Sequence, residues 1–564
     1  MTSYIASLKK PSFQFFFCLL VSFVIVGFAQ PDWSVTLCVI SGSIGIALFW
    51  KAALHLQKRS ALFWLCSAWY AAVQAVQLSW FLSDQYVGWP IFVFLPLFSA
   101  ALGLQFGCVS ILVLSKKPLD FFRIAAASSL WVIMEWSRLK FLSGDSWNPI
   151  GLMLSATSAS MQCASLFGVF GLSFWIFFTN LLALKWINNR LVLKNLIIWI
   201  VAASLPYALG FGLLKFHEKQ FNSFTGETLQ ALIVQTAILP EEKYPISWED
   251  RGGALTPLAQ IQKILFLLQK ERGKKIDLIL FSEGALPYGP YNELYYPEDI
   301  KRSFVEILGA QESTVLPIVK EEGEGVGNHY FARALANFFD ADVIMGLEDV
   351  ESTGEAYNAA FLFPPHSSQV SRYEKRILVP LGEYIPFEWC KRFLKRYGIQ
   401  DSFIPGKEAK VYPSKKGKIG FSICYEETWG SLMRENRLLG ANILVNLSND
   451  VWYPHSRLPM VHYLHSRLRA VEGGVPLLRS CNTGVTCGID SLGRTLGLLP
   501  FETHSERAPA AALFVQVPLY HYPTLYTSIG DAPLLMGSFG IVILFFLSLI
   551  LGSTPIFANV KREY

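Results

Sequence analysis

Residues 418–426 have the sequence K-I-G-F-S-I-C-Y-E, an apolar run that ends at the thiol of Cys424 and the carboxylate of Glu426. Runs of similar length, rich in branched apolar residues, recur through the middle of the chain at 229–235, 277–283, 342–348, 443–449 and 476–482. Their length and composition are typical of buried strands. Helical patterns lie between some of them, and strands alternating with helices favour a layered α/β domain.

Two of the helical patterns are well marked. Thr256 followed by Pro257 is a favourable helix start, because threonine caps a helix and proline fits its first turn. Further along, one apolar face is formed by Met460, Leu464, Leu468 and Val471. His462 and His465 lie in this second pattern without a third ligand at suitable spacing. We therefore expect ordinary histidines on a helix surface, and no metal site.

The composition indicates a membrane protein with a polar middle. The 564 residues are 52% hydrophobic and 16% charged, whereas about 25% is usual for soluble domains. Hydrophobic residues concentrate at the two ends, which is where membrane spans are expected. The net charge of +5 is small and dispersed, so we expect no nucleic-acid partner.

About 20 apolar residues are needed to cross a bilayer. Eight segments meet this requirement approximately: 12–29, 35–54, 61–82, 89–114, 123–142, 160–184, 195–214 and 531–553. The first also resembles a signal peptide, since Lys9 and Lys10 precede its apolar stretch. No A-x-A pattern precedes Gln30, however, and we expect this span to be retained.

Loop charges orient the predicted bundle. One set of loops carries basic clusters such as Lys116, Lys117 and Arg123, whereas the alternating short loops carry only Arg138 and Lys140. The positive-inside rule then places both chain ends in the cytoplasm. The predicted domains are a helical bundle at 1–214, an extracytoplasmic catalytic domain at 215–525, and a last span with a cytoplasmic tail at 526–564. In a diderm bacterium the catalytic domain would face the periplasm, outside the cytoplasmic (inner) membrane.

Three residues near the ends of predicted strands could carry chemistry. Glu283 lies in F-S-E-G, Lys375 in Y-E-K-R, and Cys424 in S-I-C-Y-E. A carboxylate can take the proton of a thiol, and an ammonium can stabilise the thiolate and the oxyanion that follows. Each residue alone is ordinary for a core or a surface, and their separation along the chain says nothing about proximity.

The surrounding motifs resemble those of the apolipoprotein N-acyltransferases, the membrane-bound branch of the nitrilase superfamily. The motifs occur in the family's order, and with the flanking spans the resemblance covers nearly the whole chain. They are F-S-E-G-A-L-P, R-Y-E-K-R-I-L-V-P-L-G-E-Y-I-P, S-I-C-Y-E, N-L-S-N-D-V-W-Y and P-L-L-R-S-C-N-T-G-V-T.

The resemblance implies an α-β-β-α sandwich joined to a bundle of about eight transmembrane helices. It also implies a triad in which Glu283 is the base, Lys375 the electrophilic stabiliser and Cys424 the nucleophile. Supporting or substrate-binding positions would be Glu383, Tyr425, Glu426, Trp452 and Tyr244. Tyr244 aligns with a position that the family usually fills with Trp, and Trp248 is the alternative.

The implied reaction is a two-step acyl transfer. A phospholipid would give its acyl chain to Cys424 as a thioester, and the α-amine of a diacylglyceryl-cysteine at an apolipoprotein N-terminus would accept it. The resemblance implies no metal and no other cofactor, and we expect a monomer. Aromatic residues after Glu283 and Glu383 suit a lipid–water interface: Tyr288, Tyr291, Tyr295, Tyr296, Phe387, Trp389 and Phe393. Residues 321–327 belong to a segment that looks inserted relative to the family.

Two other functions remain open at this point. A membrane-tethered nitrilase or amidase would use the same triad with water as acceptor, although a simple hydrolase does not need eight spans. A transporter or receptor is less favoured, since Glu135 is the main charge within the predicted spans and no internal repeat is evident. A disulfide among Cys390, Cys424, Cys481 and Cys487 is not excluded by spacing.

Overall fold

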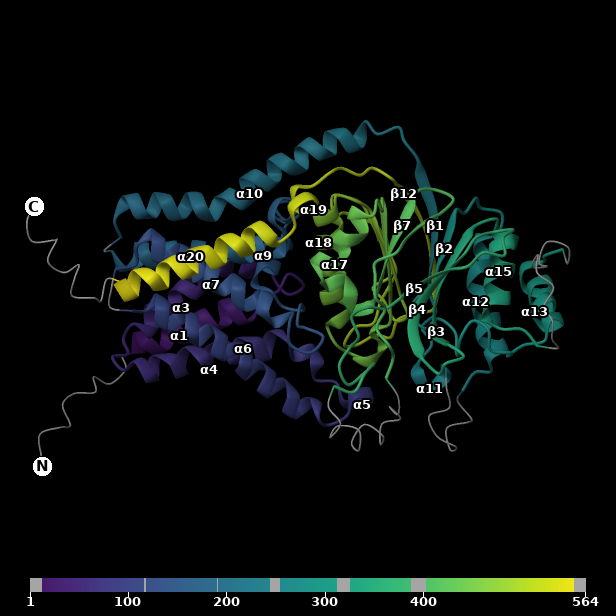
Figure 1. The fold of residues 1–564 in the computed structure, drawn as a ribbon, viewed down its shortest axis with the longest axis horizontal. Coiled ribbons are helices and arrows are strands. Elements are labelled where there is room, and N and C mark those ends of the chain that lie inside the picture. Colours follow the sequence, from purple (N-terminus) through teal and green to yellow (C-terminus); the bar gives the residue numbers. More distant parts are fainter. Residues whose placement is uncertain are drawn as a thin grey trace, which may run out of the picture.

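The chain folds into a helical bundle and a two-sheet domain that lie side by side (Figure 1). The computed structural model describes residues 13–115, 118–189, 191–243, 254–311, 325–386 and 402–551. The bundle contains α1 (Phe13–Gly27), α2 (Val35–Ile40), α3 (Ile46–Ala53), α4 (Arg59–Gln77), α6 (Ile91–Val113), α7 (Phe121–Arg138), α9 (Ala164–Asn188), α10 (Leu193–Asn222) and α20 (Ala532–Leu551).

Five helical segments of the described chain are long and apolar enough to cross a membrane. They are Val35–Ala53, Ile91–Val113, Ala164–Asn188, Leu193–Asn222 and Ala532–Leu551. The helices α1, α4 and α7 lie among them in Figure 1 but do not meet the same length and hydropathy. The fold class is thus a membrane-type helical bundle with a sheet domain, and the count of eight spans stays a prediction.

Aromatic packing holds the bundle together. The ring of Trp50 stacks on Phe106 with centroids 5.7 Å apart, and Trp131 stacks on Phe177 at 4.9 Å. These four side chains come from four helices, and all are fully buried. Aromatic rings bury large areas, so this cluster stabilises the bundle. Helix α20, which follows the sheet domain in the chain, packs on α7 and so belongs to the bundle (Figure 1).

Two six-stranded sheets form the second domain. The first has the order β12-β1-β2-β3-β4-β5, with β1 (Thr228–Gln235), β2 (Leu278–Leu280), β3 (Asp342–Val350), β4 (Ala356–Phe363), β5 (Ser371–Glu374) and β12 (Ala511–Pro518). The second has the order β11-β10-β9-β8-β7-β6, with β6 (Val411–Pro413), β7 (Lys418–Ile423), β8 (Ile443–Ser448), β9 (Leu477–Cys481), β10 (Cys487–Ile489) and β11 (Thr495–Leu498).

The two sheets face each other, and helices cover their outer faces. Ile233 and Leu280 of the first sheet pack with Phe421 and Val445 of the second in one apolar core. Outside the first sheet lie α12 (Pro257–Leu268) and α15 (Asn328–Phe339) (Figure 1). Between the second sheet and the bundle lie α17 (Gly430–Leu438) and α18 (Leu458–Gly473) (Figure 1). This is the α-β-β-α order that the resemblance implied.

The six predicted strands are all present, and two of them are at least three residues shorter than predicted. The run 277–283 forms a strand only at Leu278–Leu280, and the run 418–426 forms one only at Lys418–Ile423. Cys424 has φ +52° and opens the 3-10 helix η9 (Cys424–Thr428), because a left-handed residue cannot continue a strand. The predicted cap is confirmed, since the Thr256 side chain accepts a hydrogen bond from the Ala259 backbone N–H.

Candidate active site

Strand ends position the three predicted catalytic residues. Glu283 follows β2, Lys375 follows β5 directly, and Cys424 follows β7 directly. The backbone N–H of Lys375 donates to the carbonyl of Asn358 on β4 at 2.8 Å, which continues the pairing of β4 with β5. Loops at strand ends are held by a rigid sheet while their side chains stay free to meet a ligand.

Glu283, Lys375 and Glu383 form one hydrogen-bonded group, which we call the carboxylate–lysine cluster together with Asn358. Lys375 Nζ lies 3.1 Å from Glu283 Oε1 and 2.8 Å from Glu383 Oε1. The amide of Asn358 donates to the same two oxygens at 2.6 and 2.7 Å. Lys375 is 1% exposed, whereas the two carboxylates are each 12% exposed. The cluster is therefore buried on the lysine side and open on the carboxylate side.

Burial and neighbouring charges together shift the pKa values of Lys375 and Cys424. Burial lowers the pKa of Lys375, but Glu283 and Glu383 outweigh it, so the net pKa is well above the usual value. Burial, followed by the charge of Glu283, raises the pKa of the Cys424 thiol, and Lys375 opposes this rise. Lys375 thus stays an ammonium, and the thiol needs a base to become a nucleophile at neutral pH.

The backbone of Cys424 is held in a conformation that L-residues rarely adopt. Its φ of +52° lies in the left-handed region. Its carbonyl accepts a hydrogen bond from the Asn446 amide at 3.2 Å and lies 3.1 Å from His462 Nε2. Such strained positions persist where the surroundings fix them, and they are enriched at functional sites.

Glu426 and Tyr425 connect Cys424 to other parts of the molecule. The buried carboxylate of Glu426 accepts hydrogen bonds from the backbone N–H groups of Arg376 at 2.5 Å, Ile377 at 3.1 Å and Ile423 at 2.8 Å. Glu426 therefore ties the loop after Lys375 to the strand before Cys424. The Tyr425 hydroxyl instead donates to the carbonyl of Gly144, in the segment after α7, at 3.0 Å.

The remaining predicted positions are spread more widely. Trp452 is 47% exposed and meets Tyr86 of the bundle edge-on, with ring centroids 6.0 Å apart. Tyr244 and Trp248 lie outside the described residues, as do Phe387, Trp389, Phe393, Cys390 and residues 321–324. Among the described tyrosines after Glu283, three are exposed and Tyr295 is buried, so Tyr295 is no interfacial residue. Cys424, Cys481 and Cys487 are free thiols.

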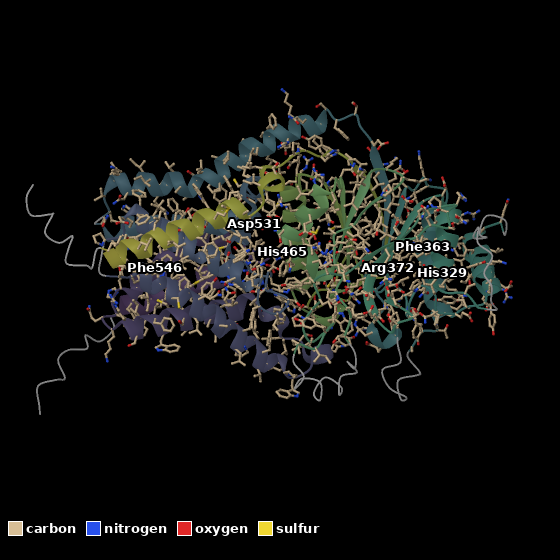
Figure 2. The ribbon with its side chains drawn as sticks, in the orientation of Figure 1. His329, Phe363, Arg372, His465, Asp531 and Phe546 are labelled. Atoms are coloured by element: carbon tan, nitrogen blue, oxygen red, sulfur yellow. The ribbon has the colours of Figure 1, made fainter. Side chains whose placement is uncertain are left out.

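The prediction that His462 and His465 lie on a helix surface was wrong, because both side chains are fully buried. His465 Nε2 lies 3.1 Å from the carbonyl of Trp147, in the segment that joins α7 to the rest of the bundle. Figure 2 places His465 where the bundle meets the sheet domain. Helix α18 is covered on one side by the second sheet and on the other by the bundle, so no face of it is left for solvent.

Two residues of the site carry no clear signal in the sequence. Asn358 lies in the run A-Y-N-A-A-F-L-F, where one amide among apolar residues is the only hint. Lys243, in P-E-E-K, has the composition of a surface turn, yet it is partly buried and contacts the carbonyl of Gly284. Burial lowers the pKa of Lys243 to about 8, against Glu348 and Glu283, which raise it.

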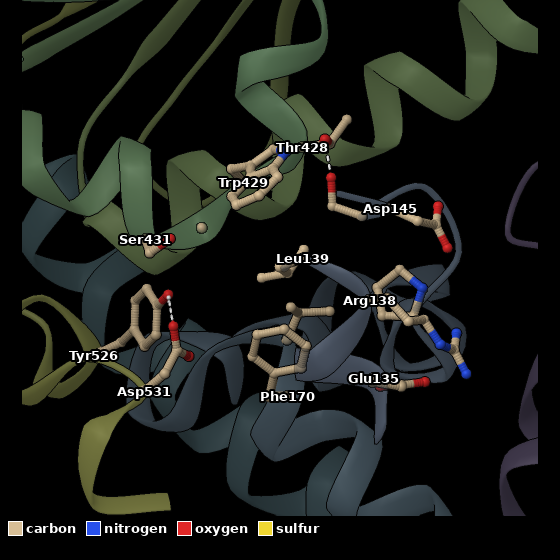
Figure 3. A pocket seen from close by; sticks show the side chains of 14 residues that line it. Glu135, Arg138, Leu139, Asp145, Phe170, Thr428, Trp429, Ser431, Tyr526 and Asp531 are labelled. Atoms are coloured by element: carbon tan, nitrogen blue, oxygen red, sulfur yellow. Dashed lines mark hydrogen bonds between the residues drawn. The ribbon is translucent and has the colours of Figure 1, made fainter. Parts of the chain in front are cut away.

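A cavity at the junction of the two parts of the molecule is separate from this site. It is lined from the bundle by residues such as Glu135, Arg138 and Phe170, and from the sheet domain by Thr428 and Trp429 (Figure 3). None of the predicted triad lines it. Its location between the parts indicates a packing gap at the junction, and no catalytic role is assigned to it.

Comparison with known proteins defines first the class and then the family. A model of the Carbon-nitrogen hydrolase family matches residues 245–505, so the sheet domain is a domain of that class. A model of the Apolipoprotein N-acyltransferase N-terminal domain matches residues 7–182. The apolipoprotein N-acyltransferase of Chlamydia caviae is 34% identical over 92% of this chain and 94% of the relative. That of Chlamydia muridarum is 36% identical over 91% and 93%. The chain belongs to the apolipoprotein N-acyltransferase family of membrane enzymes.

Among solved structures, Nit3 of Saccharomyces cerevisiae, a member of branch 10 of the nitrilase superfamily, is similar to this chain. The identity is 14%, the TM-score is 0.35, and the likeness covers 55% of this chain and 95% of Nit3.

Proposed function

We propose that this protein moves an acyl chain from a phospholipid to the N-terminal amine of a diacylglyceryl-cysteine in apolipoproteins, through a thioester on Cys424. The observation that carries the proposal is the shared ammonium of Lys375, bonded at once to Glu283 and Glu383 and electrostatically coupled to the thiol. Family membership over more than nine-tenths of the chain supports the choice of substrates. The catalytic roles of Cys424, Glu283 and Lys375 are part of this proposal.

In the first half-reaction, Glu283 takes the proton of the Cys424 thiol, and the sulfur attacks the ester carbonyl of the phospholipid. Two N–H groups of Lys375 donate to Glu283 and Glu383 among the described residues, so its third N–H can donate to the oxyanion. The carbon–oxygen bond then breaks. Glu283 returns its proton to the departing oxygen, and a lysophospholipid leaves while the acyl group stays on sulfur.

In the second half-reaction, the neutral α-amine of the acceptor attacks the thioester carbonyl. Glu283 takes the proton that the nitrogen loses, and Lys375 again faces the oxyanion. The carbon–sulfur bond breaks, the amide leaves, and the proton on Glu283 returns to the thiolate of Cys424. Glu383 is not required to exchange protons in this scheme. Its carboxylate accepts the backbone N–H of Val379 at 2.7 Å and holds Lys375 in place.

The topology proposed with this function places the sheet domain on the periplasmic face of the bacterial inner membrane. Support comes from the basic loops on the opposite side of the predicted bundle. Tyr288 is 46% exposed and is the candidate for contact with a lipid surface. Tyr296 is 66% exposed but caps α13 (Pro297–Ser303), which lies at the end of the sheet domain away from the bundle (Figure 1), so it gives no such support. Both substrates are lipid-anchored, so a site at the membrane surface can reach each of them.

The test supplies the purified protein with a phospholipid and a short peptide whose N-terminal residue is diacylglyceryl-cysteine with a free amine. The expected products, identified by mass, are the N-acylated peptide and a lysophospholipid in equal amounts. Cys424→Ala should form neither product. Free fatty acid without N-acylated peptide would instead identify a hydrolase that uses water as acceptor, and the proposal would then fail.

A further inference from the structure

A second charged group lies directly behind the backbone of Cys424. Its members, Glu427, Asp450, His462 and Arg479, are called the buried cluster below, and each side chain is at most 1% exposed. His462 Nδ1 lies 3.0 Å from Asp450 Oδ1, and His462 Nε2 lies 3.0 Å from Glu427 Oε1. Arg479 bonds both carboxylates, with Nε 2.8 Å from Glu427 and Nη2 2.9 Å from Asp450.

The charges of this cluster balance. Burial opposes the ionised form of all four groups, but their mutual attraction outweighs it for each. The pKa values of Glu427 and Asp450 fall below their usual range, whereas those of His462 and Arg479 rise. Two carboxylates therefore face one imidazolium and one guanidinium. A neutral set of this kind is the form in which ions are tolerated in a protein interior.

His462 is the member that reaches the proposed nucleophile. Its Nε2 lies 3.1 Å from the carbonyl of Cys424, and the Asn446 amide reaches the same oxygen at 3.2 Å. When Nδ1 donates to Asp450 and Nε2 is also protonated, the single Nε2–H can donate to this carbonyl, while the charge of the ring attracts Glu427, whose Oε1 lies 3.0 Å from the same nitrogen. The two donors come from α18 and β8, so they fix the peptide plane of Cys424 from two elements.

The membrane bundle also contacts the His462 imidazole, in addition to the buried cluster and the backbone of Cys424. The ring of Trp147 meets His462 edge-on, with centroids 5.1 Å apart, and lies 5.2 Å from the ring of Tyr425. The Trp147 carbonyl also faces His465 Nε2 at 3.1 Å. Trp147 belongs to the segment between α7 and η3 (Ile150–Ala156), so the bundle braces α18 at the level of His462.

We propose that His462 is a positioning residue for acyl transfer: its imidazolium holds the left-handed backbone of Cys424 and offsets the two buried carboxylates that would oppose a thiolate. The inference rests on the proposed role of Cys424 as nucleophile. Without the imidazolium, Glu427 and Asp450 would share one guanidinium, and the cluster would carry a net negative charge next to the thiol. A negative charge nearby raises the pKa of a thiol, as Asp450 already does for Cys424.

The charged and titratable groups around His462 are few in the described residues. Glu427 faces it from η9, Asp450 from η10 (Asp450–Trp452) and Arg479 from β9. On its own helix lies His465, whose pKa burial lowers to about 3, so that ring is neutral at physiological pH. His465 is a matched control: it is the same residue type, on the same helix and equally buried, but its Nε2 contacts the carbonyl of Trp147 and not that of Cys424.

The test measures the rate at which iodoacetamide alkylates Cys424 between pH 6 and 10, with the modified peptide identified by mass. His462→Gln keeps a side-chain donor but removes the charge. It should raise the thiol pKa and slow alkylation at neutral pH by about tenfold, the effect of a pKa shift of about one unit. Asp450→Asn should shift the thiol pKa downward. His465→Gln should leave it unchanged.

Equal thiol pKa values in His462→Gln and His465→Gln would overturn the inference. Should His462→Gln fail to fold, the wild-type protein supplies the second measurement. Its alkylation rate should rise with pH as the thiol ionises, with no separate step near pH 6–7. A step there would mean that His462 titrates in the usual range of histidine, and it would overturn the inference as well. Failure of the proposed function gives a different result. If Cys424 is not the nucleophile, the protein with fully alkylated Cys424 will still N-acylate the peptide.

Discussion

The carboxylate–lysine cluster and the buried cluster both combine acidic and basic side chains next to Cys424, but they differ in access to substrate. In the carboxylate–lysine cluster, Lys375 is buried and the carboxylates of Glu283 and Glu383 are each 12% exposed. In the buried cluster, no side chain is more than 1% exposed. The first has two carboxylates for one ammonium, whereas the second has two of each sign.

This difference indicates that the carboxylate–lysine cluster takes part in catalysis and that the buried cluster holds the structure around Cys424. An exposed carboxylate with an excess of negative charge can take a proton from a thiol or an amine and release it. A closed, neutral set cannot exchange protons with substrate, and it acts only through geometry and through its field. Substitutions in the buried cluster should therefore mainly lower the free energy of unfolding. Substitutions in the carboxylate–lysine cluster should mainly lower the rate of acyl transfer.

Arg479→Met should have the largest effect, and that effect should be on stability. It leaves Glu427 and Asp450 buried with too little positive charge, and breaking a buried ion pair from one side typically destabilises by about 3–5 kcal/mol. Thermal unfolding of the protein in detergent measures the change. Arg302→Met is the matched control, because Arg302 pairs with Asp299 on the exposed surface of α13 (Pro297–Ser303) at 3.8 Å, and it should change stability by less than about 1 kcal/mol.

Lys375→Met should slow formation of the thioester by roughly 100- to 1,000-fold, since it removes the donor proposed for the oxyanion. Single-turnover acylation of Cys424 from a phospholipid, followed by mass, measures this rate. The control is Lys410→Met, because Lys410 also bonds a carboxylate, that of Glu374 at 2.6 Å, but is 26% exposed. An unchanged acylation rate in a folded Lys375→Met protein would remove Lys375 from the mechanism.

Glu472, on α18 beside the bundle, should make stability depend on pH. Burial raises its pKa from 4.5 to about 7, and Arg469 opposes the rise. The folded chain therefore binds more protons than the unfolded chain between these values, and the free energy of unfolding falls as pH rises from about 4.5 to about 7. The fall is at most about 3 kcal/mol.

Glu472→Gln cannot ionise, so this dependence should disappear. The variant also loses the ion pair with the buried Arg469, at 3.1 Å, so the difference between the two pH values is compared and not the absolute melting temperature. Melting temperatures at pH 5 and pH 8 test the point, with the exposed Glu435→Gln as control. A wild-type protein that is more stable at pH 8 than at pH 5, with no change in Glu472→Gln, would contradict it.

Asn358→Ala should have the smallest effect, about a tenfold loss of acylation rate. The amide donates to both Glu283 and Glu383, and a hydrogen bond to a charged group is worth about 1.5–3 kcal/mol. The fold should be retained, because Asn358 lies in a strand whose backbone pairing is untouched. Asn337→Ala on α15 is the control, and equal rates in the two variants would show that the amide does not align the carboxylates.

The sequence predicted the carboxylate–lysine cluster better than the buried cluster, and the reason is physical. Glu283 and Cys424 lie at or near the ends of short apolar runs, so the pattern of strands places them near strand ends. Lys375 follows the polar run S-R-Y-E, and only the motif around it pointed to this residue. Asn358 lies inside a strand, and nothing in the sequence pattern identifies it as a site residue. The strand at 418–426 was predicted too long, since periodicity contains no sign of the left-handed backbone at Cys424.

His462 was misjudged because helical periodicity identifies one apolar face and assigns the other to solvent. Helix α18 lies between a sheet and a membrane bundle, and its polar side is covered by the bundle segment that carries Trp147. Burial of that side depends on contacts between residues more than 300 positions apart, such as His465 and Trp147. A single sequence read locally does not contain this information.

The most direct test of the account is the intact mass of the purified protein after incubation with a phospholipid and no acceptor. We expect the mass to increase by one acyl group, located on the Cys424 peptide. This added mass should disappear when the diacylglyceryl-cysteine peptide is supplied. Cys424→Ala should show no increase. An acyl group found on another residue, or N-acylated peptide produced by Cys424→Ala, would contradict the account.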